Sequence, residues 1–142
     1  MKEKSKKYSD LIVWQKSHSL ALEVYSISKQ FPKEEIFGLT SQLRRASISV
    51  PANIAEGFAR KGIKDKLRFY NIAEASLSEV SYFLLLSQEL GYAETSYLID
   101  KVDEIGRMLN SYSKSISDID KHANINYLKI LTTNYLSYNI LT

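Results

Sequence analysis

Cysteine is absent from the 142-residue chain, and its absence removes several classes of site at once. The chain can have no disulfide framework, no thiolate-bound metal and no cysteine nucleophile. A domain of this length can bury a stable core without such cross-links. The absence also agrees with a reducing compartment.

Long apolar runs are missing as well. The basic N-terminus MKEKSKKYSD leads into LIVW, and Gln15 and Lys16 end that run after four residues. A membrane span needs about 20 apolar residues, and a secretory signal also needs a longer apolar segment than this one. We therefore expect a soluble cytoplasmic protein.

Glycine and proline interrupt helices most often, and the chain has only five glycines and two prolines. Hairpin dipeptides and sustained alternation of polar and apolar residues are absent, which argues against strands. Apolar residues instead recur every three or four positions in four long segments, at about residues 10–30, 33–61, 64–90 and 94–116. The predicted fold class is all-α. Because short connections make successive helices antiparallel, residues 9–117 should form an antiparallel up-down four-helix bundle.

Two terminal segments lie outside the predicted bundle. Residues 1–8 form a basic N-terminal arm with four lysines and one glutamate. Residues 118–142 form a C-terminal tail rich in Asn, Thr, Tyr and Ile. The composition of the tail leaves three alternatives open: it is disordered, it packs on the bundle, or it packs on a neighbouring subunit.

Pro51 lies inside the second predicted helix, within the segment SISVPANIAEG. A proline in a helix interior costs about 3 kcal/mol and frees one carbonyl. The apolar stripe nevertheless keeps its phase across Pro51, which favours one helix with a kink at this residue. The alternative is a break, with Ser49 capping a new helix. Asn53 either faces solvent or satisfies a backbone group that the proline releases.

Metal and catalytic patterns are not found. A di-iron bundle needs Glu-x-x-His on two helices, but His18 and His122 follow Gln15 and Ile119 at that spacing. His18 falls on the apolar stripe, where a packed, hydrogen-bonded histidine is expected. No G-x-S-x-G motif occurs, and GFARKGIK at residues 57–64 lacks the spacing of a phosphate-binding loop. We therefore expect a protein that is not an enzyme and holds neither a metal nor a cofactor.

Two glutamates occupy unusual positions on or beside the apolar stripes. Glu56 and Glu79 either reach solvent at the stripe edges, or one of them is buried and paired with Arg44 or Arg45. A buried carboxylate without such a partner would be very costly.

A basic cluster around the second and third helices is the best functional candidate. Residues 44–69 hold only two acidic side chains against seven basic ones: Arg44, Arg45, Arg60, Lys61, Lys64, Lys66 and Arg68. Such groups can neutralise phosphates, and the nearby Phe58, Phe69 and Tyr70 could stack on unpaired bases. The alternatives are an ordinary charged loop with core aromatics and, for Arg44 and Arg45, structural pairing with acidic residues of the third or fourth helix.

Three stretches carry a resemblance to a known family. DLIVWQKSHSLALEVY, FPKEEIFGLTSQLRRASISVPANIAEG and AEASLSEV followed by ELGY occur here in the order of the family. The chain resembles, over about residues 9–116, the four-helix bundle proteins encoded in intervening sequences of bacterial 23S ribosomal RNA. One departure is Ala75-Ser76, where the family usually has a glycine-serine pair.

The resemblance implies an up-down bundle that forms a ring-shaped homo-oligomer, a pentamer. A related accessory protein of diversity-generating retroelements has this architecture and binds nucleic acid and a reverse transcriptase. Binding to ribosomal RNA is the usual supposition for the ribosomal members. For this chain the resemblance therefore implies self-association, and either ribosomal RNA, another nucleic acid or a protein as partner.

The resemblance also suggests a role for the segment around Pro51. Our hypothesis is that the bend lets the two halves of the helix meet different neighbours, with the small residues Ala52, Ala55 and Gly57 allowing close approach. Asn53 and Glu56 would then make fixed polar contacts. The sequence thus predicts an oligomeric bundle that binds nucleic acid, and the alternative is a protein-binding scaffold.

Overall fold

The structure is a computed structural model that describes residues 5–140, with side chains described for residues 5–132. It contains four α-helices: α1 (Ile12–Ile27), α2 (Leu39–Ala59), α3 (Ile63–Glu89) and α4 (Ser96–Ile140). Three single-turn 3-10 helices, η1 (Tyr8–Asp10), η2 (Ser28–Gln30) and η3 (Lys33–Glu35), flank α1 and precede α2. The described residues include no β-strand.

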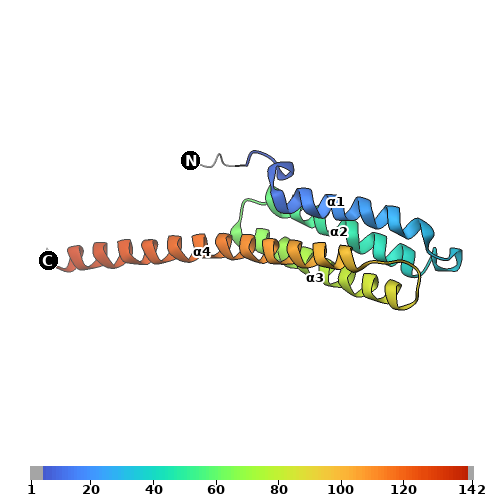
Figure 1. The fold of residues 1–142 in the computed structure, drawn as a ribbon. Helices are drawn as coiled ribbons and strands as arrows, with labels where there is room; N and C mark the ends of the chain where they lie inside the picture. The colour runs from blue at the N-terminus through green and yellow to red at the C-terminus, as the bar shows by residue number, and fades with distance from the viewer. Residues whose placement is uncertain (1–4, 141–142) are drawn as a thin grey trace.

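The four helices form the predicted all-α bundle (Figure 1). Each helix packs on two others, α1 on α2 and α4, and α3 on α2 and α4. Short connections at alternating ends give the up-down order (Figure 1). The core lies along the common axis and is built from the apolar stripes, with Val24, Leu43, Val50, Ile54, Val80, Leu84, Leu98 and Leu109 fully buried. The predicted fold class is therefore confirmed.

Helix α2 runs without interruption through Pro51, as the phase of its stripe predicts. The bend at Pro51 stays a prediction. The start of α2 differs from the prediction, because the helix begins at Leu39 and not near Lys33. Glu35 accepts a hydrogen bond from the Leu39 amide at 2.8 Å, so this carboxylate caps the helix from the preceding turn. Gly38 leaves room for it, since a Cβ there would lie 2.7 Å from the Glu35 Oε2 atom.

Helix α4 is longer than the sequence pattern predicts. It does not end near Ile116 but continues to Ile140, and its second half projects beyond the other three helices (Figure 1). The predicted tail thus begins as a continuation of α4. We call the part of this projecting segment whose side chains are described, residues 117–132, the α4 extension. Packing of the tail on another subunit stays a prediction.

The predicted structural motif around Pro51 joins α2 to α3. Asn53 donates hydrogen bonds to the carbonyl oxygen of Ser49 at 2.8 Å and to its hydroxyl at 3.0 Å. That hydroxyl lies 2.8 Å from the Ser76 hydroxyl on α3. Proline frees the carbonyl four residues earlier, which is that of Ser47. Ser49 therefore links α2 to α3, and Asn53 supports its hydroxyl and does not satisfy the carbonyl that Pro51 releases.

Candidate nucleic-acid interface and apolar groove

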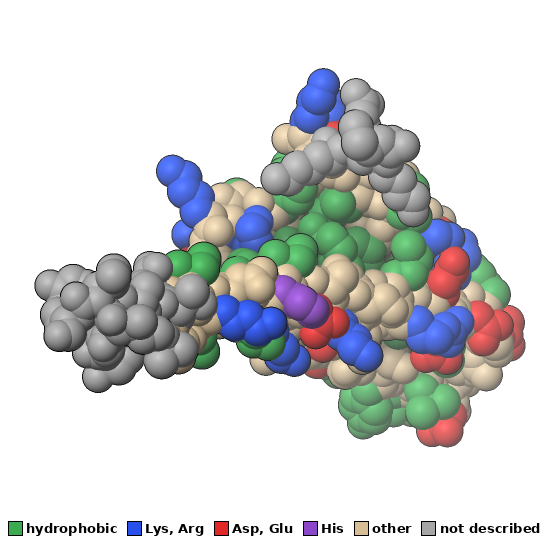
Figure 2. Space-filling view, turned by 90° about the vertical axis from the view of Figure 1, so that its left-hand side faces the viewer, with side chains coloured by type: hydrophobic (Ala, Val, Ile, Leu, Met, Phe, Trp, Pro, Cys, Tyr) green, Lys and Arg blue, Asp and Glu red, His purple; other side chains and the backbone are tan. Residues whose placement is uncertain are grey.

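The connection between α2 and α3 lies at the same end of the bundle as residues 5–8 and the α4 extension (Figure 1). Exposed or partly exposed basic side chains gather there from two segments of the chain. We call them the basic end: Lys6, Lys7, Arg60, Lys61, Lys64 and Arg68. Figure 2 looks onto this end and shows Lys and Arg side chains around an apolar area beside the projecting helix.

Two of the seven predicted nucleic-acid-binding residues are engaged within the fold. The Lys66 ammonium donates to the carbonyl oxygens of Gly57 at 3.2 Å and Phe58 at 2.8 Å. It therefore caps the C-terminus of α2, where carbonyls lack helical partners. Arg44 donates from Nε to the Ser28 hydroxyl at 2.7 Å and lies over the Tyr25 ring at 4.9 Å. Arg44 thus joins α2 to α1 and does not pair with an acidic residue of α3 or α4.

Arg60 and Arg68 lie on the surface and are held by nearby side chains. The Arg60 guanidinium lies 4.6 Å from the centre of the Phe69 ring, and that of Arg68 lies 5.1 Å from it. Glu56 accepts from Arg60 at 2.9 Å, and Asp65 lies 3.8 Å from Arg68. Ion pairs this exposed contribute at most about 1 kcal/mol, so a phosphate can replace either carboxylate. Phe69 orients the two cations and is less suited to stacking on a base.

The remaining predicted binding residues are exposed. Lys61 and Lys64 lie on the α2–α3 connection and the first turn of α3. Arg45 is also exposed but lies about 20 Å along α2 from the basic end, at 1.5 Å per residue. The structure therefore brings together four of the seven predicted residues, with Lys6 and Lys7 of the predicted N-terminal arm at the same end, but it separates Arg45 from them.

The two unusual glutamates both lie on the surface. Glu56 pairs with Arg60 and is exposed, and Glu79 is exposed on α3. The alternative in which one of them is buried and paired with Arg44 or Arg45 is therefore wrong. Both helices carry their apolar stripes beside these residues, so long carboxylate side chains at the stripe edge can reach water.

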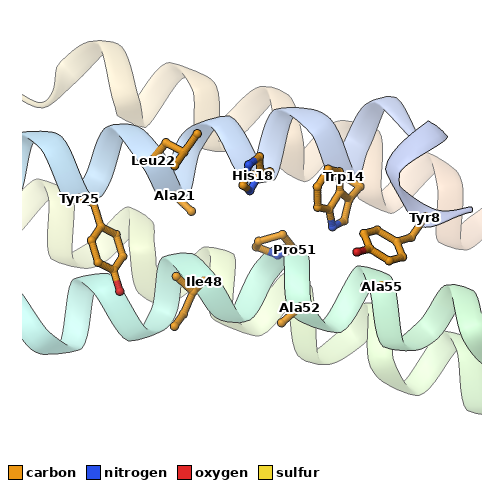
Figure 3. Close-up of a pocket in the computed structure, with 10 residues that line it drawn as sticks. All are labelled: Tyr8, Trp14, His18, Ala21, Leu22, Tyr25, Ile48, Pro51, Ala52 and Ala55. Carbon is orange, nitrogen blue, oxygen red and sulfur yellow. The ribbon is translucent and has the colours of Figure 1, made fainter.

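His18 is not packed in the core, contrary to the prediction. It is exposed and stacks on Trp14 with ring centres 4.9 Å apart and planes 9° apart. Both rings line an apolar groove of about 400 Å³ between α1 and α2 (Figure 3). We call this the α1–α2 groove, and its lining residues are Tyr8, Trp14, His18, Ala21, Leu22, Tyr25, Ile48, Pro51, Ala52 and Ala55.

The small residues Ala52 and Ala55, next to Pro51, line this groove. Pro51, Ala52 and Ala55 form its α2 wall, facing the aromatic rings of α1 (Figure 3). Ala52 and Ala55 are small and keep the groove open, whereas Gly57 lies outside it, against Tyr70 of α3, and approach of another helix to the groove stays a prediction. Sequence reasoning did not place the groove, because its aromatic residues occupy positions that also fit a core stripe. The exposure of Leu22 and Ile48 marks it as a surface.

The opposite face between α1 and α4 is closed by charged pairs. Lys16 lies 2.8 Å from Glu104, and Lys101 lies 2.6 Å from Glu23. The hydrogen bond and charge of Lys16 hold the pKa of Glu104 below its ordinary value. This face is therefore polar and locally satisfied, in contrast to the α1–α2 groove.

Within the described residues, His, Asp and Glu side chains form no group of three or more arranged to hold a metal ion. Nor does any helix in the same part of the chain combine the length and apolar character needed to cross a bilayer.

Comparisons with known proteins identify a family and a similar solved structure. The profile of the 23S rRNA-intervening sequence proteins matches residues 9–111. A crystal structure of a protein of unknown function from the S23 ribosomal protein family of Bacteroides thetaiotaomicron is similar, with 25% identity and a TM-score of 0.68. The similarity covers 72% of this chain and 99% of that one. No curated protein sequence matches the chain. The predicted relation to accessory proteins of diversity-generating retroelements stays a prediction.

Proposed function

The chain belongs to the 23S rRNA-intervening sequence protein family, and from this premise we propose that it is a non-enzymatic, self-associating bundle that binds structured RNA through its basic end. The observation that supports RNA binding is the position of Lys61 and Lys64. They are exposed beside Arg60 and Arg68, at the end where Lys6 and Lys7 also lie.

The mode of binding follows from the surroundings of these cations. Basic side chains from two separate segments can contact several phosphates at once, and release of counterions then favours the complex. Phe69 lies between two guanidinium groups, and Phe58 lies 5.6 Å from the Lys66 ammonium, so neither ring is free to read a base. The protein therefore recognises the phosphate backbone and shape of the RNA, not its sequence.

The experiment compares two double variants that change charge equally at opposite ends of the bundle. Lys61→Glu with Lys64→Glu alters the basic end, and Lys29→Glu with Lys33→Glu alters exposed lysines of η2 and η3 at the other end (Figure 1). Binding to a structured ribosomal RNA fragment is measured at several salt concentrations, with duplex DNA and a polyanion as competitors.

We expect the Lys61 and Lys64 variant to lose at least about tenfold in affinity. Its slope of log affinity against log salt should fall by about two, as for two lost phosphate contacts. The Lys29 and Lys33 variant should bind RNA nearly as the wild type does. Equal losses in both variants, or equal binding of the polyanion, would refute a defined RNA interface.

The second candidate function is a scaffold that binds only protein. It is favoured by the α1–α2 groove, where the exposed Leu22 and Ile48 lie beside aromatic rings, because apolar surfaces of this kind often bind proteins. A scaffold would keep its protein partner in the Lys61 and Lys64 variant. A copy number of five and a cytoplasmic location stay predictions, and light scattering tests the first.

A further inference from the structure

The α4 extension exposes large apolar side chains along a helix that the rest of the described chain does not cover (Figure 1). Ile119, Tyr127 and Leu128 are each 62% exposed, and Ile130 is 58% exposed. A single helix in water gains little from its backbone alone, and most helices are stabilised by packing of an apolar face. The extension therefore needs a partner on this face.

Four apolar residues of the extension form one face in phase with the bundle, whereas Ile125 and Leu128 lie on other sides of the helix. Ile119, Ala123, Tyr127 and Ile130 follow each other at intervals of three or four residues. They continue the stripe of Tyr112 and Ile116, which pack against the core. The face that holds α4 in its own bundle thus runs on past the end of that bundle.

The polar residues of the extension indicate the chemistry of its partner. Asp118 and Asp120 balance Lys121 and Lys129, so the extension has no net charge. Helices that lie on anionic lipid usually carry an excess of Lys and Arg on the polar face. Nucleic acid would require the same excess. A neutral apolar ridge fits a neutral apolar protein surface.

The α1–α2 groove is such a surface, and its length matches that of the ridge. The groove follows α1 from Trp14 to Tyr25, a rise of about 17 Å. The apolar face of the extension runs from Ile119 to Leu131, a rise of about 18 Å. On the α2 wall of the groove Pro51, Ala52 and Ala55 are small and Ile48 is large, whereas most side chains of the ridge are large. Large residues opposite small ones pack closely, which two identical ridges would not do.

We propose that the α4 extension of one copy lies in the α1–α2 groove of a second copy. The extension cannot reach the groove of its own chain, because α4 is one continuous helix that points away from the bundle (Figure 1). Each copy then donates one extension and accepts another. Such a heterologous contact makes a closed ring if the rotation between copies closes, and a filament if it does not.

This inference rests on the self-association part of the proposed function and names the two surfaces that meet. Its test uses two full-length variants with changes at exposed positions, so that the bundle still folds. Tyr127→Asp with Ile130→Asp disrupts the ridge, and Ala52→Arg fills the groove. The matched controls are His122→Asp on the polar side of the extension and Ser78→Arg on the exposed face of α3.

Mass is measured by light scattering for each variant and for an equimolar mixture. Each disruptive variant alone should be a monomer, because every junction lacks one surface. The mixture should form a 1:1 dimer, because one intact ridge then meets one intact groove. Both controls should keep the mass of the wild type.

Three outcomes would overturn the proposed junction. A mixture that stays monomeric would show that ridge and groove do not meet each other. Disruptive variants with wild-type mass would show that neither surface is used. Wild-type monomers that bind phosphatidylserine vesicles through the extension would make the ridge a lipid-binding surface. A wild-type monomer in solution would refute self-association as a whole, while RNA binding by the basic end is decided by the Lys61 and Lys64 variant.

Discussion

Gly57 of α2 lies directly against the ring of Tyr70 on α3. A Cβ atom at residue 57 would meet the Cε1 atom of that ring at 2.5 Å. The Tyr70 ring is completely buried, so moving it aside would require repacking of the core around it. The close approach of α2 and α3, the most extensive helix pair of the bundle, therefore depends on the missing side chain.

Gly57→Ala should lower the free energy of unfolding by about 1–2 kcal/mol. Overpacking a well-filled core costs about 1–3 kcal/mol, and the better helix propensity of alanine offsets up to about 1 kcal/mol. The matched control is Gly106→Ala on α4, where the nearest side-chain atom lies at an ordinary 3.6 Å. Gly106→Ala should raise the free energy of unfolding by about 0.5–1 kcal/mol. Urea unfolding of both variants is the measurement, and a stabilised Gly57→Ala would show that Tyr70 can yield.

Tyr70→Phe should leave the bundle as stable as the wild type or more stable by up to about 1 kcal/mol. The Tyr70 hydroxyl is buried and has no hydrogen-bond partner in the described structure, so its removal loses no bond. Thr95→Val is the control, because the buried Thr95 hydroxyl donates to the Leu84 carbonyl at 2.7 Å. Thr95→Val should lower the free energy of unfolding by about 1–2 kcal/mol. A larger loss for Tyr70→Phe than for Thr95→Val would contradict this account.

Alkaline pH should destabilise the wild type more than Tyr70→Phe. Burial of the Tyr70 phenol is the main cause that raises its pKa above its ordinary value of 10.0. The folded state keeps the phenol proton while the unfolded chain releases it, so this stabilisation is complete below pH 10 and is lost as pH rises further. Above about pH 10 the free energy of unfolding of the wild type should fall, relative to that of Tyr70→Phe, by about 1.4 kcal/mol per pH unit. Unfolding free energies between about pH 9 and 11 test it, and parallel curves for the two proteins would refute it.

Substitution of Lys66 should lower stability with little effect on RNA binding, and substitution of Lys61 should do the opposite. Lys66→Met removes the hydrogen bonds to the last carbonyls of α2 and should cost about 1–2 kcal/mol of stability. Its RNA affinity should change less than about twofold. Lys61→Met should show the reverse, with stability within about 0.5 kcal/mol of the wild type and weaker RNA binding. Unfolding and salt-dependent binding are measured for both variants, and similar effects of the two would remove the distinction.

The helices were predictable where the apolar spacing is regular and glycine marks the ends. Helix α3 spans Ile63–Glu89 against a predicted 64–90, because Gly62 and Gly91 bracket an uninterrupted stripe. The start of α2 was wrong because the carboxylate of Glu35 caps it through a turn at Gly38, which no propensity reveals. The end of α4 was wrong because Asn and Thr weaken the pattern after Ile116. The continued spacing of Ile119, Ala123 and Tyr127 was the available signal.

The candidate site was less predictable, because a cation's role depends on what lies beside it in space. Arg44 and Lys66 are as basic in sequence as Lys61, but both contact groups of other helices. Arg44 contacts Ser28, sixteen residues away, and Lys66 contacts the carbonyl of Gly57, nine residues away. The aromatic residues around Phe69 fit either a core or a surface by spacing alone. Only packing distinguishes a lysine that caps a helix from one that meets a phosphate.

Helix α4 spans 45 residues, a length of about 67 Å, and no glycine or proline follows Gly106. The helix therefore has no hinge between the bundle and its far end. Whatever holds the extension also fixes the orientation of the bundle at a set distance. In an assembly of several copies, α4 would set the distance between neighbouring bundles, and the basic ends would recur at one constant interval. An RNA long enough to reach two of them would bind with the effective concentration that this interval sets.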